Sequence, residues 1–250
     1  MLRRSALVLL ALAPLAAGCA RLGAKAPRET VEAPAFSARE AARSADGVAA
    51  RPGDAAFVGA RLRALRLQPL AGRDFLTQRA GLPAAAGYVS GKYPLRSSEL
   101  VVVAVALGDA PETVGGVLEL ARVTARVSRF FVAPERTLLF LALPGAPGDP
   151  APLRAFFTVP AWPLDSTAAV VYVGLGADGA ARVGEALRPL GVRLVAVPPA
   201  PGALATARAA YAALLPVSYG LGAPSDTLST PADSLRAPAD SLGGRVRRPG

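Results

Sequence analysis

Apolar and polar residues alternate in blocks along this chain, and the blocks predict strands and helices in turn. The block from Leu100 to Leu107 is entirely apolar, stops at Gly108 and Asp109, and is followed as far as Arg122 by apolar residues at helical spacing. A continuous apolar block is typical of a strand buried on both faces, and the spacing after it is typical of a helix packed on a sheet. We therefore predict the first half of a βαβ unit in this stretch.

The same kind of pattern recurs on both sides of this unit. It predicts further strands at 75–78, 86–90, 136–143, 168–173 and 192–197, and helices at 37–50, 54–65, 113–127, 180–190 and 204–215. Ser37, which stands three residues before Glu40, and Asp54 are the expected N-caps of the first two helices. Strands that alternate with helices favour a mostly parallel sheet covered on both faces. The predicted fold class is therefore α/β, with three layers and a mostly parallel central sheet flanked by helices.

The length and the two ends of the chain set the predicted domain organisation. The 250 residues suffice for one α/β domain with tails. We assign 1–19 to a signal peptide, 20–36 to a polar tether, 37–235 to the domain and 236–250 to a low-complexity tail.

The signal peptide is similar to that of a bacterial lipoprotein. Arg3 and Arg4 precede an apolar segment, and small residues lead to Cys19, the only cysteine of the chain. In a lipobox this cysteine is lipidated and becomes the mature N-terminus, and an exported chain with a single cysteine has no internal disulfide partner. An ordinary signal peptide that contains a cysteine is the alternative. The interpretation predicts a cell-envelope protein held at a membrane through Cys19. Ala20 does not resemble an inner-membrane retention signal, which favours the periplasmic side of the outer membrane.

The composition excludes several kinds of catalytic site. The chain has no histidine, so it cannot form a His-ligated metal site, a Ser-His-Asp triad or a Cys-His pair. A Ser-Lys dyad would need Lys25 or Lys92, and neither stands in a Ser-x-x-Lys pattern. The net charge of +10 comes from scattered arginines without a basic stripe that interleaves with aromatic residues, so nucleic acid is not an expected partner.

A glycine-rich turn from Gly174 to Gly179 stands between a predicted strand and a predicted helix, as in a dinucleotide-binding fingerprint. That fingerprint should be completed by an acidic residue at the end of the next strand, where this chain has Val197-Pro198-Pro199. A plain strand-to-helix turn is the favoured interpretation. A nucleotide-binding module remains an alternative.

Several segments resemble motifs of the exported co-catalytic di-zinc aminopeptidases, whose fold also includes glutaminyl cyclase and the transferrin receptor ectodomain. These segments are Gly87-Tyr88-Val89-Ser90-Gly91, Leu118-Glu119-Leu120-Ala121-Arg122, Arg136-Thr137-Leu138-Leu139-Phe140-Leu141-Ala142 and Thr230-Pro231-Ala232-Asp233-Ser234. The resemblance is one of order and pattern from about residue 51 to 235. It implies a three-layer α/β domain of zinc-aminopeptidase type.

The chain departs from this family at the positions where the family holds its metals. The positions that correspond to the family's ligands and general base are Val105, Leu107, Asp109, Ala146, Pro147, Gly174 and Ser229. Only Asp109 can still bind a metal ion, and a di-zinc site needs several N or O ligands and a base. Glu112 and Glu119 lie on the predicted helix and are interpreted as a cap and a solvated position.

The sequence therefore predicts a degenerate member of this family without catalytic residues, metal or cofactor. Its expected role is that of a binding or structural module, with a peptide or another envelope protein as the partner. The competing hypothesis is an active metallopeptidase whose site is built from carboxylates such as Asp109, Glu112 and Asp149.

Overall fold

The computed structural model describes residues 35–70, 72–78, 83–130, 133–158 and 162–218. The predicted signal peptide with Cys19, most of the tether, Ser229 and the predicted tail at 236–250 lie outside the described residues.

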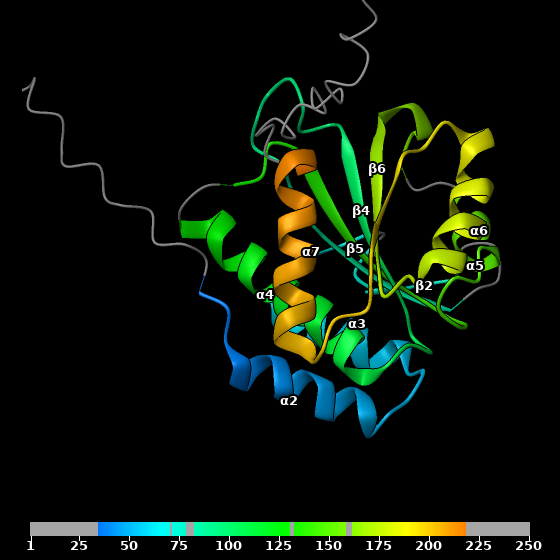
Figure 1. Ribbon diagram of the computed structural model, residues 1–250. Coiled ribbons are helices and arrows are strands. Elements are labelled where there is room, and N and C mark those ends of the chain that lie inside the picture. The colour runs from blue at the N-terminus through cyan, green and yellow to red at the C-terminus, as the bar shows by residue number, and fades with distance from the viewer. Residues whose placement is uncertain (1–34, 71, 79–82, 131–132, 159–161, 219–250) are drawn as a thin grey trace, which may run out of the picture.

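A single seven-stranded sheet forms the centre of the domain (Figure 1). Its strands are β1 (Gln68–Pro69), β2 (Leu76–Thr77), β3 (Ala84–Val89), β4 (Leu100–Ala106), β5 (Thr137–Leu143), β6 (Thr167–Val173) and β7 (Leu194–Val197). The order is β1-β3-β5-β4-β6-β7, with β2 paired to β3. Strands β4 to β7 run parallel, and β1, β2 and β3 make the antiparallel edge. The α/β class and the mostly parallel sheet are as predicted.

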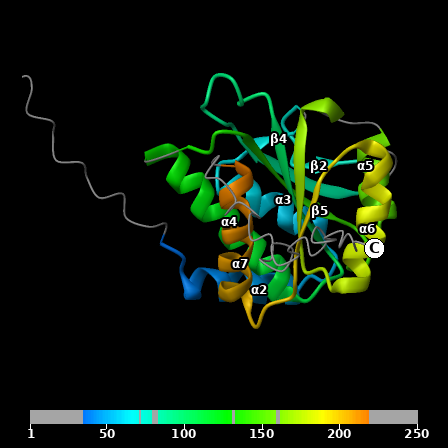
Figure 2. The same ribbon diagram turned by 45° about the horizontal axis from the view of Figure 1, so that its top comes forward.

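Helices cover both faces of this sheet and complete three layers. The helices on one face are α2 (Ala38–Ala49), α3 (Ala55–Ala64), α4 (Pro111–Phe130) and α7 (Ala203–Ser218). The helices on the other face are α5 (Ala151–Thr158) and α6 (Ala177–Leu187), which lie together across the sheet from α4 and α7 (Figure 2). Among the described helices, none has both the length and the apolar character needed to cross a membrane.

Strand β4 lies in the middle of the core, as its continuous apolar block predicts. Val101, Val103 and Val105 pack against the helices of one face, while Leu100 and Val102 pack against those of the other. All seven residues of the strand are at most 1% exposed. Burial on both faces explains why this strand has no polar position.

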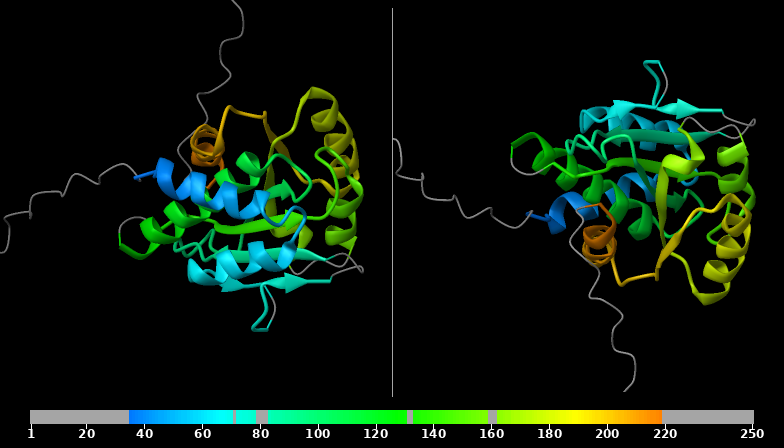
Figure 3. Two further views of the ribbon diagram at one scale, coloured as in Figure 1. Left: turned by 90° about the horizontal axis from the view of Figure 1, so that it is seen from below. Right: turned by 90° about the horizontal axis from the view of Figure 1, so that it is seen from above.

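Helix α2 lies outermost on its face, across α4 and α7 (Figure 3). A Cβ atom at Gly115 of α4 would stand 2.7 Å from the backbone nitrogen of Ala45, and one at Gly116 would stand 2.7 Å from the carbonyl oxygen of Ala203. The two glycines therefore permit backbone approaches that any side chain would prevent.

The predicted N-caps are confirmed. The Ser37 hydroxyl accepts a hydrogen bond from the Glu40 N–H, and the Asp54 carboxylate accepts from the N–H groups of Ala56 and Phe57. The predicted strands and helices are present with shifted ends. Helix α5 is absent from the prediction, although Asp149 caps it and Leu153, Phe156 and Phe157 form its buried stripe.

Candidate functional site at the carboxyl ends of the parallel strands

The loops that follow β4, β5 and β6 meet at one edge of the sheet. In open α/β sheets this edge is where ligands bind. The described candidate positions all belong to these strands or loops: Val105, Leu107, Asp109, Ala146, Pro147 and Gly174. The fold thus places the sequence-predicted positions near one another, as a family-like site requires.

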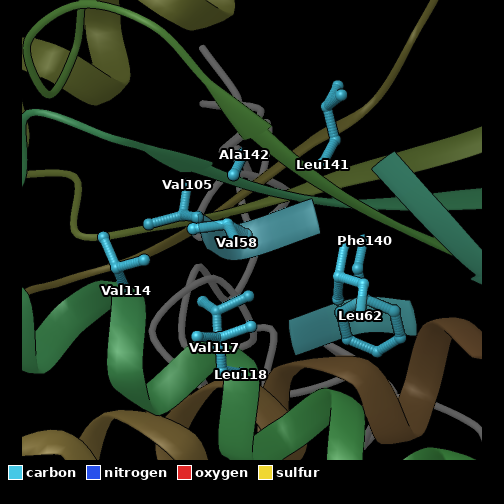
Figure 4. A pocket seen from close by; sticks show the side chains of 9 residues that line it. All are labelled: Val58, Leu62, Val105, Val114, Val117, Leu118, Phe140, Leu141 and Ala142. Carbon is cyan, nitrogen blue, oxygen red and sulfur yellow. The ribbon is translucent and has the colours of Figure 1, made fainter. Parts of the chain in front are cut away.

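Val105 and Leu107 belong to the hydrophobic core. Val105 is 1% exposed and Leu107 is 4% exposed. Figure 4 shows Val105 beside Val114 and Val117 of α4, around an apolar cavity of about 10 Å³. A void of this size is at the lower limit for a single water molecule. Both positions therefore contribute packing under α4.

Asp109 is the only carboxylate among the described candidate positions, and it lies two residues before the start of α4. One oxygen, Oδ1, accepts a hydrogen bond of 2.7 Å from the N–H of Ala110. The other, Oδ2, is buried and has no partner among the described residues. Burial raises the pKa of the Asp109 carboxyl above its ordinary value, and the Ala110 N–H and the side chain of Thr113 oppose that rise only in part.

Gly174 makes room for this carboxylate. It ends β6 with φ of +89°, and a Cβ atom at this position would lie 2.0 Å from Asp109 Oδ2. The family's aspartate would stand here according to the resemblance. In this chain the Asp109 carboxylate fills the volume that such a side chain would need.

The loop after β5 carries Ala146 and Pro147 and is held against its neighbours through backbone contacts. The N–H of Gly108 donates to the carbonyl of Gly145 at 3.0 Å. A Cβ atom at Gly148 would lie 2.7 Å from Cα of Gly179, so the loop rests directly on the first turn of α6. Asp149 uses Oδ1 to cap α5 through the N–H of Ala151.

An open cleft of about 300 Å³ lies between this loop and the start of α6. Its lining includes Pro147, Leu175, Gly176, Asp178 and Arg182. Arg182 donates through Nε to the carbonyl of Gly148. The cleft therefore contains one acidic and one basic side chain beside a helix N-terminus without a side-chain cap.

The glycine-rich turn is used in packing and in backbone hydrogen bonds. The N–H groups of Gly174 and Leu175 both donate to the carbonyl of Val197, at 2.9 and 3.1 Å. These donors are therefore not free to hold a pyrophosphate. The close contact of Gly179 with Gly148 accounts for a glycine at that position.

Tyr172 of β6 lies near the same carboxylates. Burial, and then the negative charges of Asp109 and Asp149, raise the pKa of Tyr172 to about 12. The phenol is therefore neutral at physiological pH and does not provide a general base there.

The donor set does not fit a pair of zinc ions. Across the described ranges, no three His, Cys, Asp or Glu side chains come together. Asp109 commits one oxygen to the N–H of Ala110, and Asp149 commits one to the N–H of Ala151 at the start of α5. Glu112 is exposed in the first turn of α4. Zinc sites of this kind need three or four N, O or S ligands for each ion.

Glu119 is not solvated, and the prediction for this residue was wrong. Its side chain is fully buried and forms an ion pair with Arg122 at 2.7 Å. It also accepts a hydrogen bond of 2.6 Å from the N–H of Ser37, while Arg122 donates to the carbonyl of Ala35. The helical spacing of Glu119 carries no sign of these partners, because they lie more than 80 residues away in the sequence.

Comparison with known proteins identifies the fold. No protein-family model matches the chain, and no curated protein matches it in sequence. A glutaminyl cyclase from an Acidobacteriales bacterium superposes over 79% of this chain and 99% of its own, with 11% identity and a TM-score of 0.51. A protein from Bacteroides vulgatus classed as a Zn-dependent exopeptidase superposes over 76% of this chain and 100% of its own, with 11% identity and a TM-score of 0.50.

A more distant match, to an aminopeptidase from Aneurinibacillus sp. strain AM-1, spans 48% of that enzyme at 11% identity and a TM-score of 0.41. The two larger matches cover nearly the complete length of the proteins concerned. At this level of identity they establish the architecture alone. The chain has the zinc-aminopeptidase-like fold.

Proposed function

We propose that this chain is a lipid-anchored cell-envelope protein whose zinc-aminopeptidase-like domain has lost metal binding and peptidase activity and serves as a binding or structural module. The observation that carries the proposal is the packing and hydrogen bonding of the Asp109 carboxylate. Asp109 is the only metal-binding side chain at the described candidate positions, and it packs on Gly174 and accepts a hydrogen bond from the N–H of Ala110.

The surrounding positions support this function. Val105 and Leu107 are core residues, and the 250-residue sequence contains no histidine. A buried ligand left without its metal would cost several kcal/mol, at an order-of-magnitude level. Apolar or small residues at these positions avoid that cost.

A peptidase with a carboxylate-only site is the second candidate, and the geometry disfavours it. Asp109 and Asp149 each accept from a backbone N–H of a different loop or helix, and within the described residues no three His, Cys, Asp or Glu side chains form a cluster. The nucleotide-binding alternative at Gly174 to Gly179 is disfavoured because β7 ends at Val197 without the acidic residue that would hold a ribose.

The membrane attachment rests on the sequence around Cys19. A Cys19→Ser variant is expected to leave the membrane fraction of cells and to lose incorporation of labelled fatty acid. Retention of the label by the variant would contradict lipidation at this residue.

The test of lost activity is turnover of chromogenic aminoacyl substrates by the purified chain with added zinc. We expect no release above the background of an Asp109→Asn variant prepared in the same way. Zinc-dependent release of N-terminal residues that Asp109→Asn abolishes would instead establish an active enzyme.

A further inference from the structure

A basic pocket lies at the opposite end of the sheet from the candidate site. It has a volume of about 350 Å³, and its polar lining consists of Arg66, Gln68, Ser90, Lys92, Ser128 and Arg129. These residues come from the turn after α3, from β1, from the loop after β3 and from the last turns of α4. Val89 of β3 pairs with Leu138, near the start of β5, which places the pocket at the amino ends of the parallel strands.

The cations of this pocket have no acidic counterpart. Among the described residues, no carboxylate lies within salt-bridge distance of Arg66, Lys92 or Arg129. Two acids that are close in sequence to these cations pair with other arginines, Asp74 with Arg63 and Glu135 with Arg96. None of the residues that line the pocket is acidic.

Backbone carbonyls hold two of these cations in place. Arg129 donates through Nη2 to the carbonyls of Leu65 and Arg66 at 2.8 and 2.9 Å, and Lys92 donates through Nζ to the carbonyl of Ser128 at 3.0 Å. A guanidinium has five N–H donors and an ammonium has three, so both groups retain donors for a ligand. The pocket thus has positioned cations with unused donors.

Arg66 has an unusual backbone conformation. Its φ of +59° is the only positive value on a described residue other than glycine. An arginine in the left-handed region costs about 1 kcal/mol or more relative to glycine, and such strain is concentrated at functional positions. A glycine would suit this turn better, so the arginine at this position points to a use for its charge.

We propose that the basic pocket binds a phosphate group. Clustered Arg and Lys side chains with hydroxyl and amide neighbours are the usual partners of phosphate oxygens. The phosphate can belong to an anionic lipid headgroup or to a soluble phosphate ester. Arg122, seven residues before Arg129 on α4, donates to the carbonyl of Ala35, so the described chain begins about 10 Å from Arg129 along this helix.

The experiment compares the full chain carrying Cys19→Ser, purified in neutral detergent, with two variants in the same background. One combines Arg66→Gln, Lys92→Gln and Arg129→Gln. The matched control combines Arg154→Gln, Arg193→Gln and Arg208→Gln, which removes the same charge from exposed positions outside the pocket. Binding of inorganic phosphate and glycerol 3-phosphate is measured by calorimetry against chloride at equal ionic strength. Flotation with phosphatidylcholine vesicles, with and without phosphatidylglycerol, is measured in parallel.

We expect phosphate binding that weakens about tenfold for each pocket cation removed and that the control retains. Phosphatidylglycerol-dependent flotation that only the pocket variant loses identifies a lipid headgroup, while binding of the soluble esters without it identifies a soluble ligand. Arg66→Gly keeps the fold because glycine suits the positive φ, and it should weaken binding by itself. Absence of phosphate binding to the parent chain, or an equal loss in the control, overturns the proposal.

Discussion

Among individual side chains, Asp109 and Gly174 best explain the difference between this site and a zinc site. The Asp109 carboxylate packs against the backbone of Gly174. One of its oxygens is buried and has no hydrogen-bond partner among the described residues. The identity of Asp109 fits the resembling family, but its one hydrogen bond among the described residues is with the N–H of the adjacent Ala110. One matching residue type is therefore weak evidence for a metal site.

Replacing Gly174 by aspartate, the residue expected from the family, should destabilise the domain. The new Cβ atom would lie 2.0 Å from Asp109 Oδ2 at a φ of +89°. We expect a loss of about 2–4 kcal/mol in the free energy of unfolding, measured in urea. Gly176→Asp is the matched control, because no atom lies within 4 Å of its Cβ position and it is the N-cap of α6. The control should be neutral or stabilising by up to about 1 kcal/mol. Equal stability of the two variants would contradict the geometry at Gly174.

The raised pKa of Asp109 predicts a pH-dependent effect of Asp109→Asn. A carboxyl whose folded pKa exceeds its ordinary value of 3.8 favours the protonated folded state, so stability falls as pH rises through the folded pKa. Asparagine can still accept from the Ala110 N–H and carries no charge. The variant should therefore gain stability over the parent near neutral pH, and the difference should vanish below the ordinary pKa. A variant that is less stable at neutral pH would indicate that the charge has a partner.

Among helices, α4 connects the features of the domain. Asp109 lies two residues before its first turn, and Gly115 and Gly116 contact α2 and α7. Glu119 and Arg122 bind the backbone of Ser37 and Ala35. The buried Glu119–Arg122 pair also raises the pKa of Arg122, chiefly through the hydrogen bond with Glu119. The attachment of α2 therefore depends on a charged network inside a largely apolar layer.

Removing Glu119 should loosen this attachment. Glu119→Ala leaves Arg122 and the Ser37 N–H without their buried acceptor, and we expect a loss of about 2–4 kcal/mol in the free energy of unfolding. Glu185→Ala breaks a Glu–Arg pair of the same i,i+3 spacing that is exposed on α6, so it should cost less than about 0.5 kcal/mol. Similar losses of unfolding free energy in the two variants would show that the buried ion pair stabilises the domain no more than the exposed one.

For the domain taken together, local patterns predicted the elements well and the side-chain environments poorly. The apolar block at Leu100 marks β4 because a strand buried on both faces has no polar position. Helix α5 was missed because it directly follows a loop rich in proline and glycine. Its signal was available in Asp149 followed by apolar residues at positions 153, 156 and 157.

Features that depend on distant segments could not be read from local spacing. Glu119 is buried by residues near position 37, and the basic pocket is assembled from segments around 66, 90 and 129. A count of charged residues around positions 66, 90 and 129 would have shown that these positions have basic residues and no acidic ones beside them. It does not show that the fold gathers the segments at one end of the sheet.

The most direct test of the account is the zinc content of the purified chain. The chain is equilibrated with zinc, passed through a desalting column and analysed for metal by elemental analysis, beside Asp109→Asn. The account predicts much less than one zinc ion per chain and no difference between the two proteins. One or more zinc ions per parent chain, lost in Asp109→Asn, would contradict it.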